Sequence, residues 1–317
     1  MSNRKPILVV GSINMDLVIS AEHIPAPGET IRGTGFETHP GGKGANQAVA
    51  VARLGHPVDL IGMVGSDAFG EQLRDGLVSA GVGTDAVGIA DGASGLAVIT
   101  VAANGENAIV VQAGANDRVT PAYLDQHADR IAGAGIVLAQ LEIPLATVLH
   151  LAQLCAAANV PLILDPAPAC PLPQQLFPQI AWFTPNASEA AVYAGHAATP
   201  AAGARSLLAL GCRGVILKRG REGSYLLDRA GDEGAINSFP TNVIDTTAAG
   251  DAFNGAFAAA LLSGQSPLGS ATFASAAAAL SVTRPGAQSS MPTSAEVLAL
   301  LAPSIQQAEP CVRPCIP

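Results

Sequence analysis

Short apolar runs alternate with longer stretches of helical periodicity along most of this 317-residue chain. Runs that are apolar at nearly every position are typical of strands buried on both faces of a parallel sheet, because helices cover both faces of such a sheet. The runs lie at residues 8–10, 58–61, 136–139, 161–164 and 215–217. They predict an α/β fold in which a central, mostly parallel sheet lies between two layers of helices.

Two segments break this rhythm, residues 15–38 and 96–113. In the second segment, alternating apolar and polar residues flank Asn104 and Gly105, a dipeptide that favours a tight hairpin turn. We therefore expect a small antiparallel element outside the main sheet. With 49% hydrophobic residues the chain can form one large core, so we expect a single domain over residues 1–304. Pro310, Pro314 and Pro317 exclude a continuous helix at the C-terminus and predict a flexible tail at residues 305–317.

Charge and hydropathy exclude two classes of protein. The net charge is −9 and there is no basic tract, so the chain lacks the features of a nucleic-acid-binding protein. It also lacks a signal peptide and an apolar run of membrane-spanning length, and we expect a cytoplasmic protein.

The five cysteines have no metal-binding spacing, and their odd number favours reduced thiols, although a disulfide in the tail stays possible. They are Cys155, Cys170, Cys212, Cys311 and Cys315.

A turn of small residues leads directly into a helix at residues 245–251, which read Asp-Thr-Thr-Ala-Ala-Gly-Asp. The first N–H groups of a helix have no partner within it and lie at the positive end of its dipole. Ala248, Ala249 and Gly250 leave room for an anion there, and Asp251 places a carboxylate beside it. The alternative is that Asp251 only complements the dipole of an ordinary first turn.

A second glycine turn meets a helix start at residues 41–47, which read Gly-Gly-Lys-Gly-Ala-Asn-Gln. Its glycines let the backbone approach a ligand closely, and Lys43 and Asn46 supply donors for hydroxyl or phosphate oxygens. The spacing does not match a Walker A loop, and no dinucleotide-binding fingerprint follows the first strand.

Together these motifs resemble the ribokinase family of carbohydrate kinases, the PfkB-type sugar kinases. The resemblance extends from Gly11 to about Pro292. Besides the two turns, it includes Gly-Ser-Ile-Asn-Met-Asp at 11–16, Pro-Gly-Glu-Thr at 27–30, Gln-Leu-Glu at 140–142, Asp-Pro-Ala-Pro-Ala at 165–169, Thr-Pro-Asn-Ala-Ser-Glu at 184–189 and Thr-Arg-Pro-Gly-Ala-Gln at 283–288. It implies a three-layer ribokinase-like fold in which the two irregular segments form a β lid that closes over the sugar and pairs with a second subunit.

The resemblance also implies a catalytic apparatus for phosphoryl transfer. Asp251 would be the general base, and the N–H groups after Ala248, on Ala249, Gly250 and Asp251, would form the anion hole. The residues implied to hold the sugar hydroxyls are Asn14, Asp16, Gly42, Lys43, Gly44, Asn46 and Glu142. For Asn14 and Asp16, a turn after the first strand is the alternative.

ATP and two metal ions complete what the resemblance implies. The nucleotide contacts would be Asn186, Glu189, Lys218, Gly220, Arg221, Glu222, Gly223, Gly250 and Ser275, with Mg²⁺ near the first two. Asn186 and Glu189 can equally be a helix-capping pair. The sequence departs from the family at Lys218-Arg219 and at Ser275, and we expect Lys218 to face phosphate and Arg219 to stay solvated. The potassium site would involve Asp245, Thr247, Ser281, Arg284, Gly286 and Ser290.

The activity implied is ATP-dependent phosphorylation of the primary hydroxyl of a pentose, with D-ribose at O5 as the expected substrate. A kinase of the same fold for 2-deoxyribose, fructose or a nucleoside is the nearest alternative, and the aromatic content of 4% disfavours the nucleoside. A sugar sensor that has lost phosphoryl transfer is an alternative from a different class.

Overall fold

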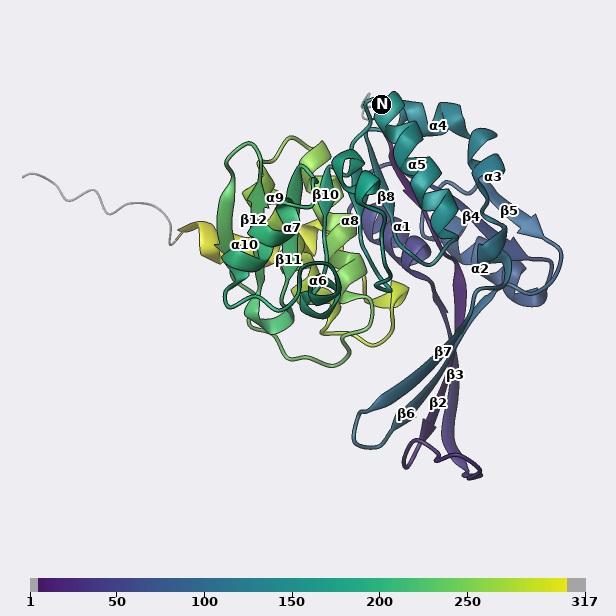
Figure 1. Ribbon diagram of the computed structural model, residues 1–317. Coiled ribbons are helices and arrows are strands. Elements are labelled where there is room, and N and C mark those ends of the chain that lie inside the picture. Colours follow the sequence, from purple (N-terminus) through teal and green to yellow (C-terminus); the bar gives the residue numbers. More distant parts are fainter. Residues whose placement is uncertain (1–4, 307–317) are drawn as a thin grey trace, which may run out of the picture.

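The computed structural model describes residues 5–306, whose centre is a nine-stranded sheet (Figure 1). The strand order is β13-β12-β11-β10-β9-β8-β1-β4-β5. From β11 across to β5 every neighbouring pair is parallel, whereas β12 pairs antiparallel with β11 and β13. The strands are β1 (Ile7–Val10), β4 (Val58–Gly65), β5 (Val87–Ala90), β8 (Ile136–Ala139), β9 (Leu162–Leu164), β10 (Trp182–Phe183), β11 (Gly214–Lys218), β12 (Ser224–Asp228) and β13 (Glu233–Ile236).

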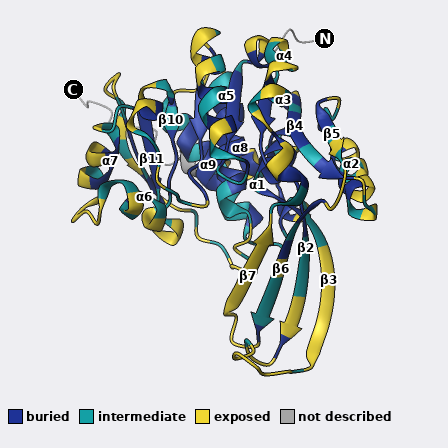
Figure 2. Cartoon of the chain, turned by 45° about the vertical axis from the view of Figure 1, so that its right-hand side comes forward, coloured by how far each residue is buried: buried dark blue, intermediate teal, exposed yellow. Residues whose placement is uncertain are grey.

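Helices cover both faces of this sheet and form a core on each side (Figures 1 and 2). In β1, Ile7 and Val9 contribute to one core, and Leu8 and Val10 to the other. The first core lies under α1 (Lys43–Arg53), α2 (Ala68–Ser79), α8 (Ala249–Leu262), α9 (Pro267–Ser281) and α10 (Ser294–Gln306). The second lies under α3 (Pro121–Asp125), α4 (Ala128–Gly133), α5 (Leu145–Ala157), α6 (Ala187–Ala194) and α7 (Pro200–Leu208). The α/β three-layer prediction is therefore confirmed.

A separate four-stranded sheet, the lid, projects from the end of the main sheet at which the parallel strands terminate (Figure 1). Its order is β3-β2-β6-β7, formed by β2 (Asn14–Ala21), β3 (Gly33–Gly41), β6 (Gly95–Ala102) and β7 (Asn107–Gln112). The β6–β7 hairpin turns at Asn104 and Gly105, as the sequence predicts, with Gly105 at a φ of 86°. In contrast, the parallel pairing of β2 with β6 joins segments far apart in the chain and was not predicted.

One short strand and the end of the last helix differ from what the sequence predicts, and residues 307–317 lie outside the described part of the chain. The two-residue strand β10 was missed, because two residues show no periodicity. Helix α10 extends to Gln306, whereas we expected the tail to begin at residue 305. Residues 307–317, including Cys311 and Cys315, lie outside the described residues, and Cys155, Cys170 and Cys212 are free thiols. Within residues 5–306, no helix is both long enough and apolar enough to cross a membrane.

The start of α1 packs directly, backbone against backbone, on the residues that follow β1. A Cβ atom added to Gly44 would lie 2.6 Å from the carbonyl carbon of Gly11, and the N–H of Ala45 donates to the carbonyl of Ser12 at 2.9 Å. Gly42, immediately before α1, has a φ of 86°, a conformation that favours glycine. The glycines of this turn therefore fix the position of the helix start over the sheet.

We expect Gly44→Ala to destabilise the protein by about 1–3 kcal/mol, because its new methyl group would collide with backbone that cannot move aside. Gly76→Ala in α2 is the matched control, since no atom lies within 4 Å of its added Cβ. That variant should be neutral or more stable by up to about 1 kcal/mol. Urea unfolding of both variants measures the difference, and equal stability would show that the Gly44 contact is not tight.

Candidate active site

Asp251 lies in the first turn of α8, where two side chains from the first turn of α1 bind it. The carboxylate accepts from Asn46 Nδ2 and from Gln47 Nε2, each at 3.0 Å. Asp251 is 4% exposed, and this burial raises its pKa to about 6, although the charge of Lys43 acts in the opposite direction. Two helix starts from opposite ends of the sequence thus converge on one buried acid.

The turn before Asp251 leaves main-chain donors available at the helix start. Ala248 adopts a left-handed conformation with a φ of 59°, and no side chain caps the helix. Of the three expected donors, the N–H of Ala249 donates to Thr246 O at 3.3 Å. In the described chain the N–H groups of Gly250 and Asp251 have no main-chain acceptor, so both can bind an anion.

A second group of charges lies beside Asp251 at the base of the lid. Glu142 Oε2 accepts from Ser12 Oγ at 2.5 Å and from the N–H of Lys43 at 3.2 Å. The carboxyl group of Asp16 lies over Gly41, where an added Cβ would come within 2.2 Å of Asp16 Oδ2. Burial, reinforced by the charge of Glu142, raises the pKa of Asp16 to about 7. Burial lowers the pKa of Lys43, but the negative charges of the surrounding carboxylates, with Asp251 foremost, have the larger effect and raise this pKa above its ordinary value.

Asn14 is oriented by a residue that sequence reasoning missed. Asn116 Nδ2 donates to Asn14 Oδ1 at 2.7 Å, and Asn116 Oδ1 accepts from the N–H of Ile13 at 2.9 Å. Asn116 is buried in a 3₁₀ turn directly after the lid, at Gly114–Arg118. A single polar residue in such a turn gives no periodic signal, so the sequence alone offered no means of finding it.

A chain of side chains connects Asp251 to Lys218 through Gln47 and Asp165. Gln47 Nε2 donates to Asp165 Oδ2 at 3.1 Å as well as to Asp251, and Gln47 Oε1 accepts from Gln140 Nε2 at 2.7 Å. Lys218 Nζ lies 3.0 Å from Asp165 Oδ1. No role was predicted from the sequence for Gln47, Gln140 or Asp165. Gln140 and Asp165 each directly follow a buried strand, a position that could have marked them as members of a site at the carboxyl ends of the strands.

Asn186 and Glu189 form the capping pair that was the alternative to a metal role. Asn186 Oδ1 accepts from the N–H of Glu189 at 2.8 Å, and Glu189 Oε2 accepts from the N–H of Asn186 at 2.7 Å. The other oxygen of Glu189 accepts from Asn186 Nδ2 at 2.8 Å. Burial raises the pKa of Glu189, and the nearby charge of Lys218 opposes that rise. Any contact of this pair with a metal must therefore occur in addition to the cap.

The remaining nucleotide candidates lie around the turn between β11 and β12. A 3₁₀ turn spans Gly220–Glu222. Gly223 has a φ of 82°, and an added Cβ would lie 2.0 Å from Ile236 O, so both its conformation and its surroundings require glycine. Arg219 keeps 30% of its side chain exposed and forms an ion pair with the exposed Glu222. In the described residues no side-chain hydrogen bond joins Arg221, Glu222 or Ser275 to the Asp251 group, and Ser275 is buried on α9.

Three of the six potassium candidates come together around the Asp245 carboxylate. Its Oδ1 accepts from the N–H and the hydroxyl of Thr247 at 2.9 and 2.6 Å, and its Oδ2 accepts from the N–H of Gly286 at 2.8 Å. Burial opposes the charged form of Asp245, but these bonds lower its pKa. The hydroxyls of Ser281 and Ser290 donate to carbonyls of their own helical turns, and Arg284 pairs with Glu296. Across residues 5–306 no three His, Cys, Asp or Glu residues form a metal-binding group.

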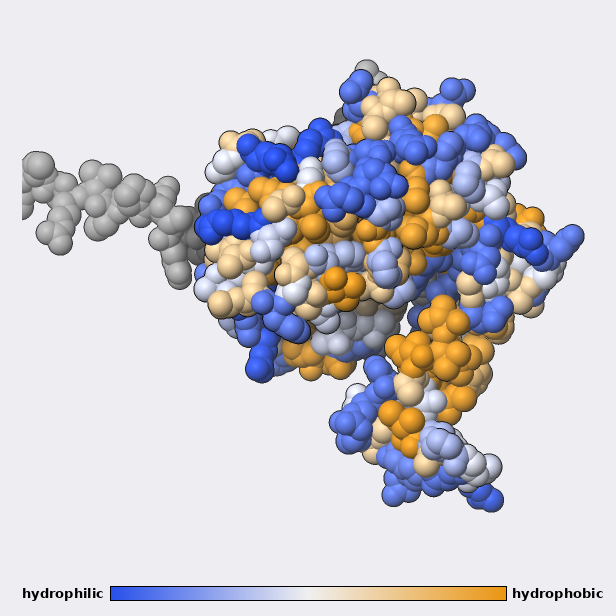
Figure 3. Space-filling view, in the orientation of Figure 1, coloured by the Kyte–Doolittle hydropathy of each residue, from blue (hydrophilic) through white to orange (hydrophobic). Residues whose placement is uncertain are grey.

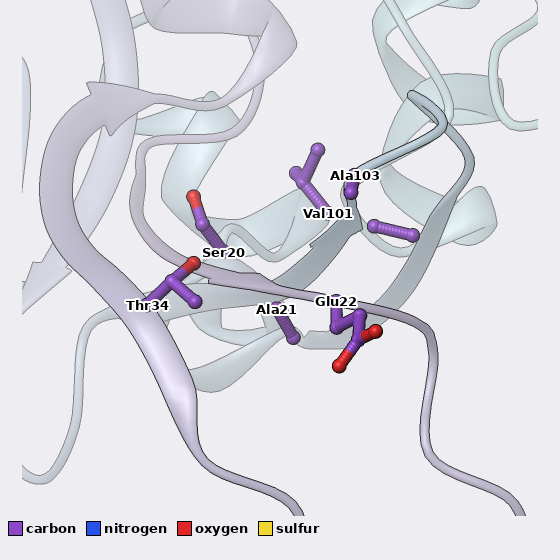
Figure 4. Close-up of a pocket in the computed structure, with 7 residues that line it drawn as sticks. Ser20, Ala21, Glu22, Thr34, Val101 and Ala103 are labelled. Atoms are coloured by element: carbon purple, nitrogen blue, oxygen red, sulfur yellow. The ribbon is translucent and has the colours of Figure 1, made fainter.

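A concavity of about 440 Å³ lies at the far end of the lid, away from these charges (Figure 4). Glu22 is its single ionisable side chain, so it lacks the convergent polar groups of a catalytic site. It is lined by Ser20, Ala21, Glu22, Thr34, Val101, Ala102 and Ala103.

The family model described as "pfkB family carbohydrate kinase" matches residues 4–294. The chain therefore belongs to the PfkB family of carbohydrate kinases. Within that family it is similar to ribokinases: it is 43% identical to that of Bacillus subtilis over 270 residues, 85% of this chain and 90% of the relative. The solved structure of Arabidopsis thaliana ribokinase complexed with ribose and ATP matches with a TM-score of 0.89 and 36% identity, covering 94% of this chain and 99% of that one. A deoxyribokinase of Salmonella typhi is 34% identical over 258 residues, 80% of this chain and 84% of the relative.

We expect Asp16→Asn to raise Tm at pH 8 by about 2–4 °C or more, with a smaller gain at pH 5. A folded-state pKa of about 7, above the ordinary 3.8, means that ionised Asp16 destabilises the folded state. This destabilisation grows as the pH rises from about 4 to 7, and an amide does not ionise. Thermal unfolding without sugar measures both values, and an equal gain at pH 5 and pH 8 would contradict the raised pKa.

Proposed function

We propose that this chain transfers the γ-phosphoryl group of ATP to O5 of D-ribose, giving ADP and ribose 5-phosphate. The observation that carries this proposal is the arrangement at the start of α8, where a buried carboxylate lies beside two free N–H groups. Such an arrangement binds a hydroxyl and a phosphoryl group next to each other. The similarity to ribokinases over most of the chain supports ribose as the sugar.

Asp251 would act as the general base. Its carboxylate accepts the O5 proton while O5 forms a bond to the γ-phosphorus and the bond from that phosphorus to the bridging oxygen breaks, releasing ADP. With a pKa of about 6, Asp251 is ionised at neutral pH and yet holds a proton more strongly than an ordinary aspartate. Asn46 and Gln47 keep the carboxylate oriented before the sugar arrives.

The donors at the start of α8 would stabilise the phosphoryl group as it moves. The N–H groups of Gly250 and Asp251, which have no main-chain acceptor in the described chain, would donate to the oxygens on which charge accumulates. That of Ala249 would join them once its weak turn bond opens. Donors fixed by the backbone need no reorganisation during the reaction.

The polar residues at the base of the lid would hold the sugar. Asp16 and Glu142 accept from hydroxyl groups, whereas Lys43, Asn14 and Asn46 donate to them. Gly42 and Gly44 let the start of α1 pack directly against the backbone that follows β1, and this packing would place Lys43 and Asn46 beside the sugar. Sugar recognition would thus use the start of α1, and phosphoryl transfer the adjoining start of α8.

ATP phosphates would lie between the start of α8 and Lys218, within reach of Asn186, Glu189 and the turn from Gly220 to Gly223. The oxygen donors of Asn186 and Glu189 suit Mg²⁺, and because both carboxylate oxygens already serve the cap, these residues would act through water. Mg²⁺, when bound, would neutralise charge on the phosphate oxygens. Potassium would be held near the Asp245 turn, beside the anion hole.

We further propose that the lid pairs with the lid of a second copy. By strand register, the exposed side chains of Ile19, Phe36, Val98 and Val110 share one face of the lid, opposite the face that carries Asp16. Phe36 is 63% and Val110 is 71% exposed, and hydrophobic side chains gather on the lid (Figure 3). An apolar patch of this kind is typical of a protein interface.

ADP release measured with D-ribose, 2-deoxyribose, fructose and adenosine, each with and without potassium, tests the proposed substrate. We expect the highest kcat/KM with ribose and a further increase with potassium. Ribose that raises Tm without any ADP release would identify a sugar sensor instead.

Asp251→Asn should lower kcat by about 10²–10⁴-fold and change the Kd for ribose far less, because general-base catalysis is removed while the hydroxyl contacts remain. ADP release and calorimetry measure the two effects, and Asp75→Asn on the exposed face of α2 is the control. In the wild type, kcat/KM should fall below about pH 6 as Asp251 is protonated. A variant with near-normal kcat would exclude Asp251 as the base.

Val110→Lys should dissociate the dimer, because it places a charge within the apolar lid face. Asn107→Lys is the matched control: it lies on the same strand, but register places it on the opposite face. Light scattering after gel filtration gives the mass of each variant. A monomeric wild type, or a Val110→Lys dimer, would contradict pairing through this face.

A further inference from the structure

The ammonium group of Lys218 lies against the turn that would hold the transferred phosphoryl group. Lys218 is the last residue of β11, and its side chain is 13% exposed. Its Nζ lies 3.5 Å from the position of a Cβ atom added to Gly250, whose N–H group is free. The side chain therefore reaches the start of α8.

Asp165 holds this ammonium group in place. Asp165 is 3% exposed, and its Oδ1 lies 3.0 Å from Lys218 Nζ. An ammonium group has three N–H donors, so one bond to Asp165 leaves two for phosphate oxygens. A buried carboxylate without a partner is costly, and the same pair therefore keeps both charges in a fixed position.

Gln47 connects this ion pair to the base. Its Nε2 donates to both Asp165 Oδ2 and Asp251 Oδ1, at 3.1 and 3.0 Å. Gln140 fixes the other end of the amide with a bond of 2.7 Å. The Gln47 amide, through Asp165, thus sets the distance between the Asp251 carboxylate and the Lys218 ammonium group.

Lys218 and Lys43 neutralise different parts of a strongly acidic site. Five carboxylates lie there, on Asp16, Glu142, Asp165, Glu189 and Asp251, and two ammonium groups. The main chain of Lys43 lies on the sugar side, where its N–H donates to Glu142, and its ammonium group is stabilised by the charges of Asp251 and Glu142. Lys218 is the ammonium group on the phosphate side.

We propose that Lys218 is a catalytic cation that stabilises the phosphoryl group during transfer, and that Asp165, linked to the base by Gln47, is its positioning residue. This inference rests on the proposed function. Lys218 stays protonated throughout: the O5 proton goes to Asp251, and the bond from the γ-phosphorus to the ADP oxygen breaks as the bond to O5 forms. Its ammonium group supplies charge to the phosphoryl oxygens and no proton.

Binding of ADP together with aluminium fluoride, which mimics the phosphoryl group in the transition state, tests this role without turnover. In the presence of Mg²⁺ and ribose, Lys218→Met should weaken binding of the ADP–fluoride complex by about 10²–10³-fold. Binding of ADP alone should change by less than about tenfold, because ADP lacks the group that Lys218 contacts. Lys218→Arg should recover part of the loss, and Arg219→Met is the matched control that removes a neighbouring positive charge.

Kinetics of a double-mutant cycle test the positioning role of Asp165. Lys218→Met should lower kcat more than it raises KM for ATP. Asp165→Asn should also lower kcat, by less, and the double variant should be no worse than Lys218→Met alone, since a positioning residue has no effect once its target is gone.

Three results would overturn the inference. Equal losses for ADP and for ADP with aluminium fluoride would make Lys218 a ground-state phosphate contact. Unchanged binding of both would make the ion pair structural. Asp165 would instead be a metal contact if Asp165→Asn regained full activity at a higher Mg²⁺ concentration while Lys218→Met had no effect on activity. Ribose-dependent ADP release by the wild type tests the proposed function separately, so either proposal can fail alone.

Discussion

The close contact between α1 and α8 determines how the rest of the site is arranged. A Cβ atom added to Gly255 would lie 2.7 Å from Ala50 Cβ and 2.9 Å from Gln47 O, so the two helices meet with almost no side chain between them. Gly255 lies one turn after Asp251 in α8. The contact that brings the helices together therefore also places Asp251 between Asn46 and Gln47, and a larger residue at Gly255 would separate the base from both of its donors.

The same contact explains how a carboxylate can be kept buried and still reactive. Burial alone would favour the neutral acid, but two amide donors and the charge of Lys43 limit the rise in the pKa of Asp251. Asn46 and Gln47 are fixed in turn: Gln47 by Gln140, and Asn46 by its place in the buried first turn of α1. Asn46 Oδ1 has no partner among the described residues, which leaves an acceptor next to the base for a sugar hydroxyl.

The sequence identified those parts of the site whose signal is local. A glycine turn before a helix can be recognised within about seven residues, and so can the capping pair at Asn186 and Glu189. The fold class followed from the lengths of the apolar runs. Contacts between distant segments gave no such signal: Asn14 meets Asn116, and Asp165 meets Lys218. Lys218 could be expected to face phosphate from its place in the nucleotide-loop segment, but neither its partner nor its closeness to Gly250 could be derived without the fold.

The helix starts of the described chain differ in whether a side chain caps them. Asp67, Asn186, Thr199 and Ser266 cap α2, α6, α7 and α9 with their own side chains. Helices α1 and α8 instead follow Gly42 and Ala248, which cannot cap, and Ala248 also occupies a conformation that costs an alanine about 1–2 kcal/mol. A capping side chain stabilises a helix by about 1 kcal/mol, yet it would occupy the donors that an anion needs. At the start of α1 the first N–H groups already donate to Glu142 and Ser12. At the start of α8 those of Gly250 and Asp251 have no acceptor among the described residues, so this is the uncapped end that would bind a charged group beside the base.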